Sequence, residues 1–367
     1  MRATLVLLLL APHLLACGHA DATEDAGSDA ALLDDAGPPD AGPTVDPTAA
    51  RFEALETDGE GPWGLWGYQV AVLDGTRAVV IGGTDAGPFG GTTYDAAWLV
   101  EVGEAALSAT PLDATGPAPR YCGCAAYDPL RERVVVHGGR DLETPAFAPE
   151  TWELDLASET WTEVASATQA AGTLGCAMAW SPGAEAVFMF GGGNRSGYRA
   201  ETHRYDPDAG EWRLVDAEGP LARYDGTLIA SHDGETLLLF GGSYGAMGSA
   251  FYADLWRFDP AAETWTEIPL PEGPVGRRIP WMVRDPERLG LYVGFGYDGA
   301  MQPLGDLWYL DLEDPDTPAW TDLPQPLDGP SYRGFARALP GGPDALGVVF
   351  GGYSTSRPVT DAWRLTR

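Results

Sequence analysis

The sequence predicts an all-β fold, a six-bladed β-propeller whose ring is closed by an N-terminal strand that completes the last blade. Two observations carry this prediction. The 367 residues include 48 Gly, 31 Pro, 13 Trp, 14 Tyr and 11 Phe, which is typical of short strands joined by tight turns around an aromatic core. An apolar run that ends in glycine recurs six times, and the copies lie about fifty to fifty-six residues apart, the spacing of propeller repeats.

The first residues indicate an export signal. Met1 and Arg2 precede an apolar run over residues 4–16, which is too short to span a bilayer and contains Pro12, so residues 1–16 are predicted to be a signal peptide. The run ends in Leu-Leu-Ala followed by Cys17, which resembles the lipobox of bacterial lipoproteins with Cys17 as the lipidated residue. Ordinary secretion, with a cysteine at this position by chance, is the alternative. The resemblance implies a protein of the bacterial cell envelope, lipid-anchored in the outer membrane or at the cell surface, with its domain outside the cytoplasm.

A tether follows over residues 17–50. Beyond Cys17 it consists mainly of Asp, Ala, Gly and Pro, and it contains eight acidic residues and no Arg. Such a segment has little apolar surface to bury and its charges repel one another, so it is predicted to be disordered and extended. The folded domain is therefore predicted to span residues 51–367.

The charge of the chain excludes several partners. The formal net charge is −32, of which about −25 lies in residues 51–367, and all 22 basic residues are Arg. Nucleic acid and anionic membrane surfaces are recognised by clustered positive charge, so we expect neither as a partner, and membrane contact only through the lipid anchor. The absence of Lys excludes Schiff-base chemistry and an ordinary phosphate-binding loop.

Each repeat unit is expected to contain four strands. The glycine-ended runs, which are predicted to be the second strands, lie at residues 79–83, 134–139, 187–193, 237–242, 291–296 and 348–352. An inner strand such as residues 68–73 precedes each run, and a third strand with a first Trp, or His203 in unit 3, follows it. A fourth strand carries a second Trp in four units, namely Trp161, Trp212, Trp265 and Trp320. We expect the paired glycines to be structural, because they permit turns that other residues resist and close approach of blades.

The paired glycines, with a later aromatic residue and Trp at fixed separation, resemble the repeats of the kelch family over the whole of residues 51–367. The resemblance implies a six-bladed kelch-type β-propeller. Unit 6 ends at Arg367 after its third strand, whereas residues 51–55 match the fourth-strand pattern of residues 265–269. The N-terminal strand is therefore expected to complete the last blade, which removes the exposed sheet edges.

One face of the propeller is predicted to bind a ligand. In a four-stranded antiparallel blade, the loops after the paired glycines and the loops that enter the inner strands emerge on the same side. These loops supply the candidate ligand-binding residues Arg120, Tyr121, Arg140, Asn194, Arg223, Tyr224, Tyr244, Arg277, Arg278, Tyr297, Tyr332, Arg333 and Tyr353. A ring of guanidinium and phenol groups at a channel mouth is suited to a carboxylate or an acidic sugar. In the alternative interpretation the arginines are structural and bond carbonyls and the recurrent acids Glu150, Glu201, Asp254, Asp306 and Asp361.

Three cysteines remain in the domain. Cys176 can form a disulfide with Cys122 or with Cys124, or all three can be small buried side chains. Their spacing matches no zinc pattern and the histidines do not cluster, so no metal and no cofactor is expected. His137 takes the place of Phe190 and Phe240 in sister units, which predicts a core residue.

The function predicted from these features is that of a cell-envelope lipoprotein whose propeller binds a protein or an anionic glycan. The alternative is a cofactor-free sugar mutarotase or epimerase, similar to periplasmic kelch proteins that act on sialic acid, using the same face. A purely architectural envelope protein is a third interpretation. The sequence contains no nucleophile elbow or zinc protease motif, and it identifies no catalytic residue, so a binding module is favoured over an enzyme.

Overall fold

The computed structural model describes residues 46–87, 90–112, 115–144, 146–165, 170–245, 250–314, 316–325, 328–342 and 344–367. The predicted signal peptide, Cys17 and nearly all of the tether lie outside these residues. Asp46–Arg367 forms one unit, which begins five residues before the predicted domain boundary. A 3₁₀ turn, η1 (Pro47–Ala49), accounts for the difference: Pro47 is buried, and its carbonyl accepts a hydrogen bond from the Tyr292 hydroxyl at 3.2 Å.

The predicted all-β fold is confirmed, because the described residues form strands and no α-helix. Units 2 to 5 each form a four-stranded antiparallel sheet. Their strands are β6 (Cys124–Asp128), β7 (Arg133–His137), β8 (Thr151–Asp155) and β9 (Thr160–Glu163); β10 (Ala177–Ser181), β11 (Ala186–Phe190), β14 (Thr202–Asp206) and β15 (Glu211–Val215); β16 (Thr227–Ala230), β17 (Leu237–Phe240), β20 (Leu255–Asp259) and β21 (Thr264–Ile268); and β22 (Trp281–Arg284), β23 (Gly290–Gly294), β24 (Leu307–Asp311) and β25 (Ala319–Asp322).

The first and last units belong to one eight-stranded sheet, in which β1 (Arg51–Asp58) lies between them. Residues 51–55 of β1 pair antiparallel with β28, and residues 56–58 pair parallel with β5. The other strands of this sheet are β2 (Gln69–Val72), β3 (Arg77–Ile81), β4 (Ala97–Val102), β5 (Ala106–Leu112), β26 (Ala338–Leu339), β27 (Ala345–Phe350) and β28 (Ala362–Thr366).

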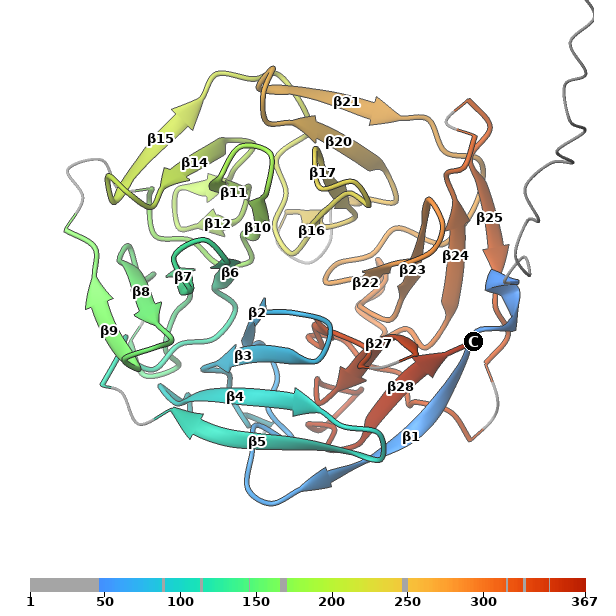
Figure 1. Cartoon of the computed structure of the whole chain (residues 1–367), viewed down its shortest axis with the longest axis horizontal. Helices are drawn as coiled ribbons and strands as arrows, with labels where there is room; N and C mark the ends of the chain where they lie inside the picture. Colours follow the sequence, from blue (N-terminus) through green and yellow to red (C-terminus); the bar gives the residue numbers. More distant parts are fainter. Residues whose placement is uncertain are drawn as a thin grey trace, which may run out of the picture. The chain divides into compact units, whose positions relative to one another are not determined.

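The sheets are arranged as in a β-propeller (Figure 1). The strands β2, β6, β10, β16 and β22 lie nearest the centre, and β5, β9, β15, β21 and β25 lie at the periphery. Two short hairpins lie outside the main sheets: β12 (Gly193–Asn194) with β13 (Gly197–Tyr198), and β18 (Ser243–Tyr244) with β19 (Ala250–Phe251).

The core lies between neighbouring sheets, and the repeated tryptophans join them. The fourth-strand Trp of a unit packs on the last residue of the second strand in the preceding unit, with ring centroids 5.2–5.8 Å apart. The contacting pairs are Trp212 with His137, Trp265 with Phe190 and Trp320 with Phe240. Each unit thus buries its aromatic residues against a neighbour, as expected for a stacked repeat.

The paired glycines are structural, as predicted. Gly191 and Gly192 have φ values of +69° and +90°, a left-handed conformation that other residues resist. A Cβ atom on Gly191 would lie 2.4 Å from the carbonyl oxygen of Arg223 in the next unit, and the Gly192 amide donates to that same carbonyl at 2.8 Å. Glycine is therefore required here both for the turn and for the close approach of two units.

A disulfide links the inner strands of units 2 and 3. Cys176 is bonded to Cys124, one of its two predicted partners, and Cys122 is a free cysteine. The reason is the backbone of Cys122, whose φ of +54° turns its side chain against Gly67 of unit 1, whereas Cys124 points to unit 3. The Cα atoms of Cys124 and Cys176 are 5.6 Å apart, within the range that a disulfide requires.

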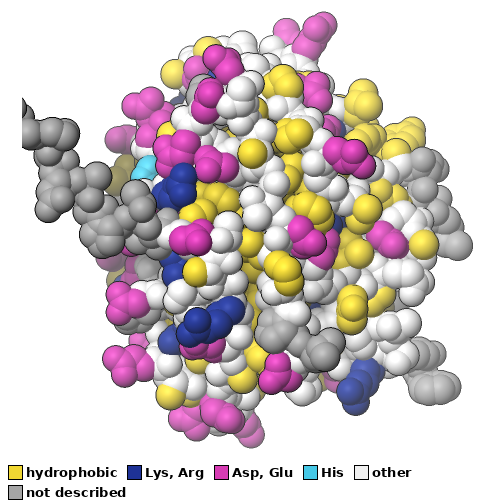
Figure 2. Space-filling model, turned by 90° about the vertical axis from the view of Figure 1, so that its right-hand side faces the viewer, with side chains coloured by type: hydrophobic (Ala, Val, Ile, Leu, Met, Phe, Trp, Pro, Cys, Tyr) yellow, Lys and Arg dark blue, Asp and Glu magenta, His cyan; other side chains and the backbone are white. Residues whose placement is uncertain are grey.

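Acidic side chains are spread over the surface, as the composition predicts. Figure 2 shows many Asp and Glu side chains on one side of the molecule, and fewer arginines among them. Within the part of the chain that the structure describes, no helix has the length and hydropathy needed to cross a bilayer.

Candidate functional site

The two sets of loops that carry the candidate residues lie side by side on one face. An isolated bridge joins the loop entering the inner strand to the loop after the paired glycines in every unit. The bridged pairs are Trp66 with Thr84, Tyr121 with Arg140, Leu174 with Gly193, Tyr224 with Ser243, Arg278 with Tyr297, and Gly334 with Tyr353. The prediction that both sets emerge on the same side is therefore confirmed, and we call this surface the loop face.

A chain of backbone hydrogen bonds runs from unit to unit at the base of the loop face. One residue of each unit has a φ between +52° and +65°, and these residues are Gly67, Cys122, Gly175, Asp225, Ile279 and Phe335. The amide of each of four members donates to the carbonyl of the preceding member at 2.6–2.7 Å, and the Gly67 amide donates to Phe335 at 3.3 Å. The residues before these positions are thereby held in fixed directions around the centre.

Four of the candidate arginines are buried inside the units. Arg120, Arg223, Arg277 and Arg333 are each at most 2% exposed. Each guanidinium donates to the carbonyl exactly 18 residues later, at 3.0–3.3 Å, and to the carbonyl two residues earlier. Their prediction as ligand-binding residues is wrong, because these side chains are engaged by protein atoms and do not reach the surface. The structural alternative describes them correctly.

The recurrent acids are the partners of these arginines in units 4 to 6. Arg223 and Arg277 form two-pronged ion pairs with Asp254 and Asp306, with N–O distances of 2.6–2.8 Å. Arg333 pairs with Asp361 at 2.6 Å. Unit 2 lacks such a pair: among the described residues, the Glu150 carboxylate has one buried oxygen without a hydrogen-bond partner.

An aromatic cluster surrounds Arg278 on the loop face. The Arg278 guanidinium lies 4.6 Å from the ring centroid of Tyr224 and 5.3 Å from that of Phe335, so both rings make cation–π contacts with it. Trp66 contacts three further rings, with centroids 4.8–5.6 Å away. These rings belong to Phe335, Tyr353 and Tyr121.

The cluster continues toward units 3 and 4. Tyr198 lies between Tyr224 and Tyr244, with ring centroids 5.1 Å from each. Aromatic side chains from five units thus form one connected surface, and Arg140 extends it with a guanidinium 5.8 Å from the Tyr121 ring. We refer to Trp66, Tyr121, Tyr198, Tyr224, Tyr244, Arg278, Phe335 and Tyr353 as the aromatic patch.

An ion pair and a thiol lie at the centre of the patch. Arg278 pairs with Asp225, whose side chain is almost fully buried. Cys122 lies near these groups, and burial raises the pKa of its thiol to about 12, with Asp225 contributing in the same direction. The thiol is therefore protonated at neutral pH, which makes it a poor nucleophile.

Three further candidate residues, Tyr297, Tyr332 and Asn194, lie outside the aromatic patch. Tyr297 is buried and donates its hydroxyl to the carbonyl of Tyr353 at 2.9 Å, so it supports the patch from below. Tyr332 is 67% exposed, and within the described part of the chain no ring contact joins it to the patch. Asn194 lines a cavity between units 2 and 3.

The sequence interpretation missed Trp66, Tyr198, Asp225 and Phe335 as members of the site. A signal for three of them was present, because Trp66, Asp225 and Phe335 occupy the two positions after the repeated Arg, or after Leu65 in its place in unit 1. Tyr198 lies in a hairpin whose direction the repeat pattern does not determine.

The described histidines include one core residue and no metal-binding cluster. His137 is fully buried, as predicted for a core residue, and burial lowers its pKa to about 4, so it is neutral at pH 7. Among the described residues no group of three or more His, Cys, Asp or Glu is placed to hold a metal ion.

A family model, the KLHDC2/KLHL20/DRC7 Kelch-repeats domain, matches residues 67–283. The chain belongs to the kelch-repeat family. The kelch match begins at Gly67 and ends in β22, so it covers the patch residues of units 2 to 4 and the Arg278–Asp225 pair, and Trp66 lies one residue before it.

Curated relatives of the kelch chain include Kelch domain-containing protein 10 of Xenopus tropicalis, which is 30% identical over 167 residues, 42% of this chain. The protein of the same name from Homo sapiens is 27% identical over 167 residues, again 42% of this chain. Adagio-like protein 3 of Oryza sativa subsp. japonica is 28% identical over 248 residues, 64% of this chain. These matches span 36–38% of the relatives' own lengths.

Proposed function

We propose that this kelch protein is an interaction module that docks a protein partner on the aromatic patch. The observation that carries the proposal is the composition and connection of the patch, in which Trp, Tyr and Arg side chains are in mutual contact. These three residue types dominate the binding energy of protein interfaces. A kelch domain as a protein-interaction module is also what the family relationship suggests.

The patch is prepared for an acidic group on the partner. Arg140 stands beside the ring of Tyr121 and has no acidic partner among the described residues, whereas Arg278 is already paired with Asp225. A guanidinium held against an aromatic ring can still donate two parallel hydrogen bonds to a carboxylate. We therefore propose that a carboxylate-bearing segment of the partner contacts the patch beside Tyr121, where Arg140 can bind it.

We further propose that the domain is a ring of six blades closed by β1. The eight-stranded sheet would then count as two blades, with β1 as the outer strand of the last one. Two observations support this arrangement: the antiparallel pairing of β1 with β28, and the hydrogen-bonded backbone positions that come once from each of six units. Closure protects sheet edges that would otherwise pair with other chains.

A photo-crosslinking experiment tests the docking surface. A photoreactive residue at Tyr244, which is 44% exposed in the patch, is expected to give a discrete crosslinked species in intact cells. Trp66→Ala is expected to weaken that crosslink about thirtyfold or more, because removal of a central aromatic anchor costs about 2 kcal/mol.

The matched control places the same photoreactive residue at Leu130. This side chain is 58% exposed and lies in the β6–β7 turn, at the end of the blade opposite to the loop face. The same species from both positions, or a Tyr244 crosslink that is unaffected by Trp66→Ala, would contradict docking on the patch.

For the cell location we propose a lipoprotein anchored through Cys17 to the cell envelope. The proposal rests on the apolar run of residues 4–16 and the cysteine that follows it. Cys17→Ser is expected to move the protein from the membrane fraction to the soluble fraction, because a lipid chain supplies the membrane affinity. Fractionation and immunoblotting would measure this change, and an unchanged membrane partition of the variant would reject the anchor.

A further inference from the structure

The tyrosines of the aromatic patch differ from most other tyrosines of the domain in their hydrogen bonding. Outside the patch, six tyrosine hydroxyls bond to protein atoms; Tyr68, for example, donates to the Phe350 carbonyl at 2.7 Å. The hydroxyls of the five patch tyrosines have no such partner among the described residues. These side chains, all at least partly exposed, are Tyr121, Tyr198, Tyr224, Tyr244 and Tyr353. The patch therefore offers hydroxyl groups to a partner as well as ring faces.

The patch offers more hydrogen-bond donors than acceptors. Arg140 lies at its edge, with a guanidinium 5.8 Å from the Tyr121 ring and no acidic partner in the described part of the chain. A guanidinium donates hydrogen bonds and cannot accept them, whereas a hydroxyl can do both. Asp225, the carboxylate at the centre, is already paired with Arg278 and is almost fully buried. We therefore expect a partner surface that is rich in acceptors and poor in donors.

The backbone of the loops beneath the patch is already paired. In units 1, 2, 5 and 6, one residue of the loop after the paired glycines forms a bridge on both sides, to the loop that enters the inner strand and within its own loop. These residues are Thr84, Arg140, Tyr297 and Tyr353. A partner that adds a strand to a sheet needs an unpaired backbone edge. Recognition at these positions must therefore use side chains.

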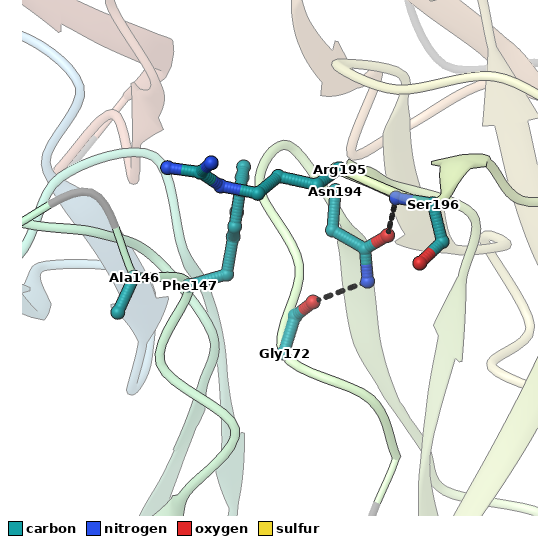
Figure 3. A pocket seen from close by; sticks show the side chains of 6 residues that line it. All are labelled: Ala146, Phe147, Gly172, Asn194, Arg195 and Ser196. Atoms are coloured by element: carbon teal, nitrogen blue, oxygen red, sulfur yellow. Dashed lines mark hydrogen bonds between the residues drawn. The ribbon is translucent and has the colours of Figure 1, made fainter.

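The tyrosine that unit 3 contributes is held in place by the β12–β13 hairpin. Tyr198 pairs with Gly193 in this hairpin. Figure 3 shows how Asn194 fixes the turn: its amide nitrogen donates to the Gly172 carbonyl at 2.9 Å, and its side-chain oxygen accepts from the Ser196 amide at 2.9 Å. A partner would therefore meet a preformed surface, which reduces the entropic cost of binding.

These properties select among the conformations that a docked segment can adopt. An α-helix satisfies its own backbone groups, so its apolar face would bury the patch hydroxyls without partners, which is unfavourable. A polyproline II segment has no internal hydrogen bonds, and its carbonyls stay available as acceptors. Proline also lacks the backbone N–H, so a proline-rich segment brings acceptors without donors. Its rings pack on aromatic side chains, as in other aromatic-lined peptide sites.

We propose that the segment docked on the aromatic patch is proline-rich and adopts the polyproline II conformation, with an acidic residue at one end of the proline run. This inference rests on the docking function proposed above. The prolines lie on Trp66 and the patch tyrosines, whose hydroxyls donate to the carbonyls of the segment. The acidic residue pairs with Arg140, whose place at the edge of the patch puts the charge at the end of the run.

Titration of the full chain with synthetic peptides, followed by calorimetry, tests the inference. The probe is a peptide of about eight prolines with blocked ends. It carries one glutamate, at the first position in one version and at the last position in the other, because a segment can lie in either direction. One version is expected to bind with a Kd below about 1 mM. Replacement of its glutamate by glutamine and Arg140→Ala are each expected to weaken binding about fivefold, and both together no more than either alone.

Tyrosine variants test the hydroxyls. Tyr121→Phe and Tyr224→Phe keep the ring and remove the hydroxyl, so each is expected to weaken binding about threefold, as for the loss of one hydrogen bond. Tyr332→Phe is the matched control and should leave the Kd unchanged, because Tyr332 is 67% exposed and lies outside the patch. A peptide of equal length and charge with Ser and Gly in place of the prolines is expected to bind at least about tenfold more weakly than the proline peptide.

Three peptide results would overturn the proposal: equal binding of the proline peptide and the Ser/Gly peptide, no saturation by either proline version at about 5 mM, or patch variants that bind like Tyr332→Phe. Saturation by cellohexaose without binding of the proline peptides would indicate a glycan and would overturn it as well. The crosslink from Tyr244 tests docking whatever the conformation of the segment. A Trp66-dependent crosslink without peptide binding would therefore reject the polyproline inference and leave docking on the patch intact.

Discussion

Deletion of residues 51–56 is expected to destabilise the domain by at least about 5 kcal/mol, a large part of the total stability of an ordinary domain. The deletion removes the pairing of β1 with β28 and leaves two sheet edges open. It also removes Phe52 and Leu55, which are 4% and 9% exposed. Phe52 alone contacts Trp281 and Phe295 with ring centroids 5.9 and 5.5 Å away, and loss of a buried Phe typically costs 3–5 kcal/mol.

Thermal and urea unfolding of the truncated and intact proteins would measure this loss. Phe52→Ala separates the packing contribution from the strand pairing, and Glu53→Ala on the exposed side of β1 is the control, with an expected change within about 0.5 kcal/mol. A truncated protein that keeps the melting temperature of the intact one would reject β1 as the strand that holds the first and last units together.

Arg277→Ala is expected to destabilise the domain by about 3–5 kcal/mol, the usual cost of breaking a buried ion pair. The Arg277 side chain is fully buried, and its guanidinium bonds both oxygens of Asp306 at 2.7 Å. The substitution leaves the Asp306 carboxylate without its cationic partner and with only the Trp308 indole as a donor, and it removes the guanidinium donor of two carbonyl groups, those of Val275 and Phe295. The cost arises from these unsatisfied acceptors as well as from the lost attraction.

A double-mutant cycle with Asp306→Asn tests whether the loss of stability arises from the unpaired charge of Asp306. In the Arg277→Ala background the asparagine carries no unpaired charge, so the double variant is expected to be more stable than Arg277→Ala alone. Arg257→Ala, on the exposed side of β20, is the control and should change the free energy of unfolding by less than about 0.5 kcal/mol. Equal stability of Arg277→Ala and Arg257→Ala would contradict the structural role of Arg277.

The adjacent residues Arg277 and Arg278 have different roles that the sequence alone does not predict. Both were candidates for the same ligand-binding ring, because they lie side by side in the loop that enters an inner strand. In the structure Arg277 points into its own unit toward Asp306, and Arg278 points to the centre toward Asp225. The left-handed residue that follows, Ile279, fixes these directions, and no local sequence signal marks an isoleucine for that conformation.

The disulfide partner of Cys176 was likewise not determined by the sequence alone. Strand alternation places Cys122 and Cys124 of one inner strand on the same side, so the sequence leaves both open as partners of Cys176. The left-handed backbone at Cys122 breaks the alternation, and the disulfide forms through Cys124. The cavity between units 2 and 3 was equally hidden, because it depends on two loops that contact each other only through tertiary packing.

The sequence by itself determined the repeat, the strands of each unit, the structural role of the paired glycines and the side on which the loops gather. These features follow from hydrophobic periodicity and turn chemistry, which act over a few residues and recur in every unit. Only the tertiary structure decided which arginines are buried, which cysteine is free and which aromatic rings meet in one patch. Those outcomes depend on how a unit packs against its neighbours and on single departures from the repeat, such as Thr173, which stands where four other units have a buried arginine.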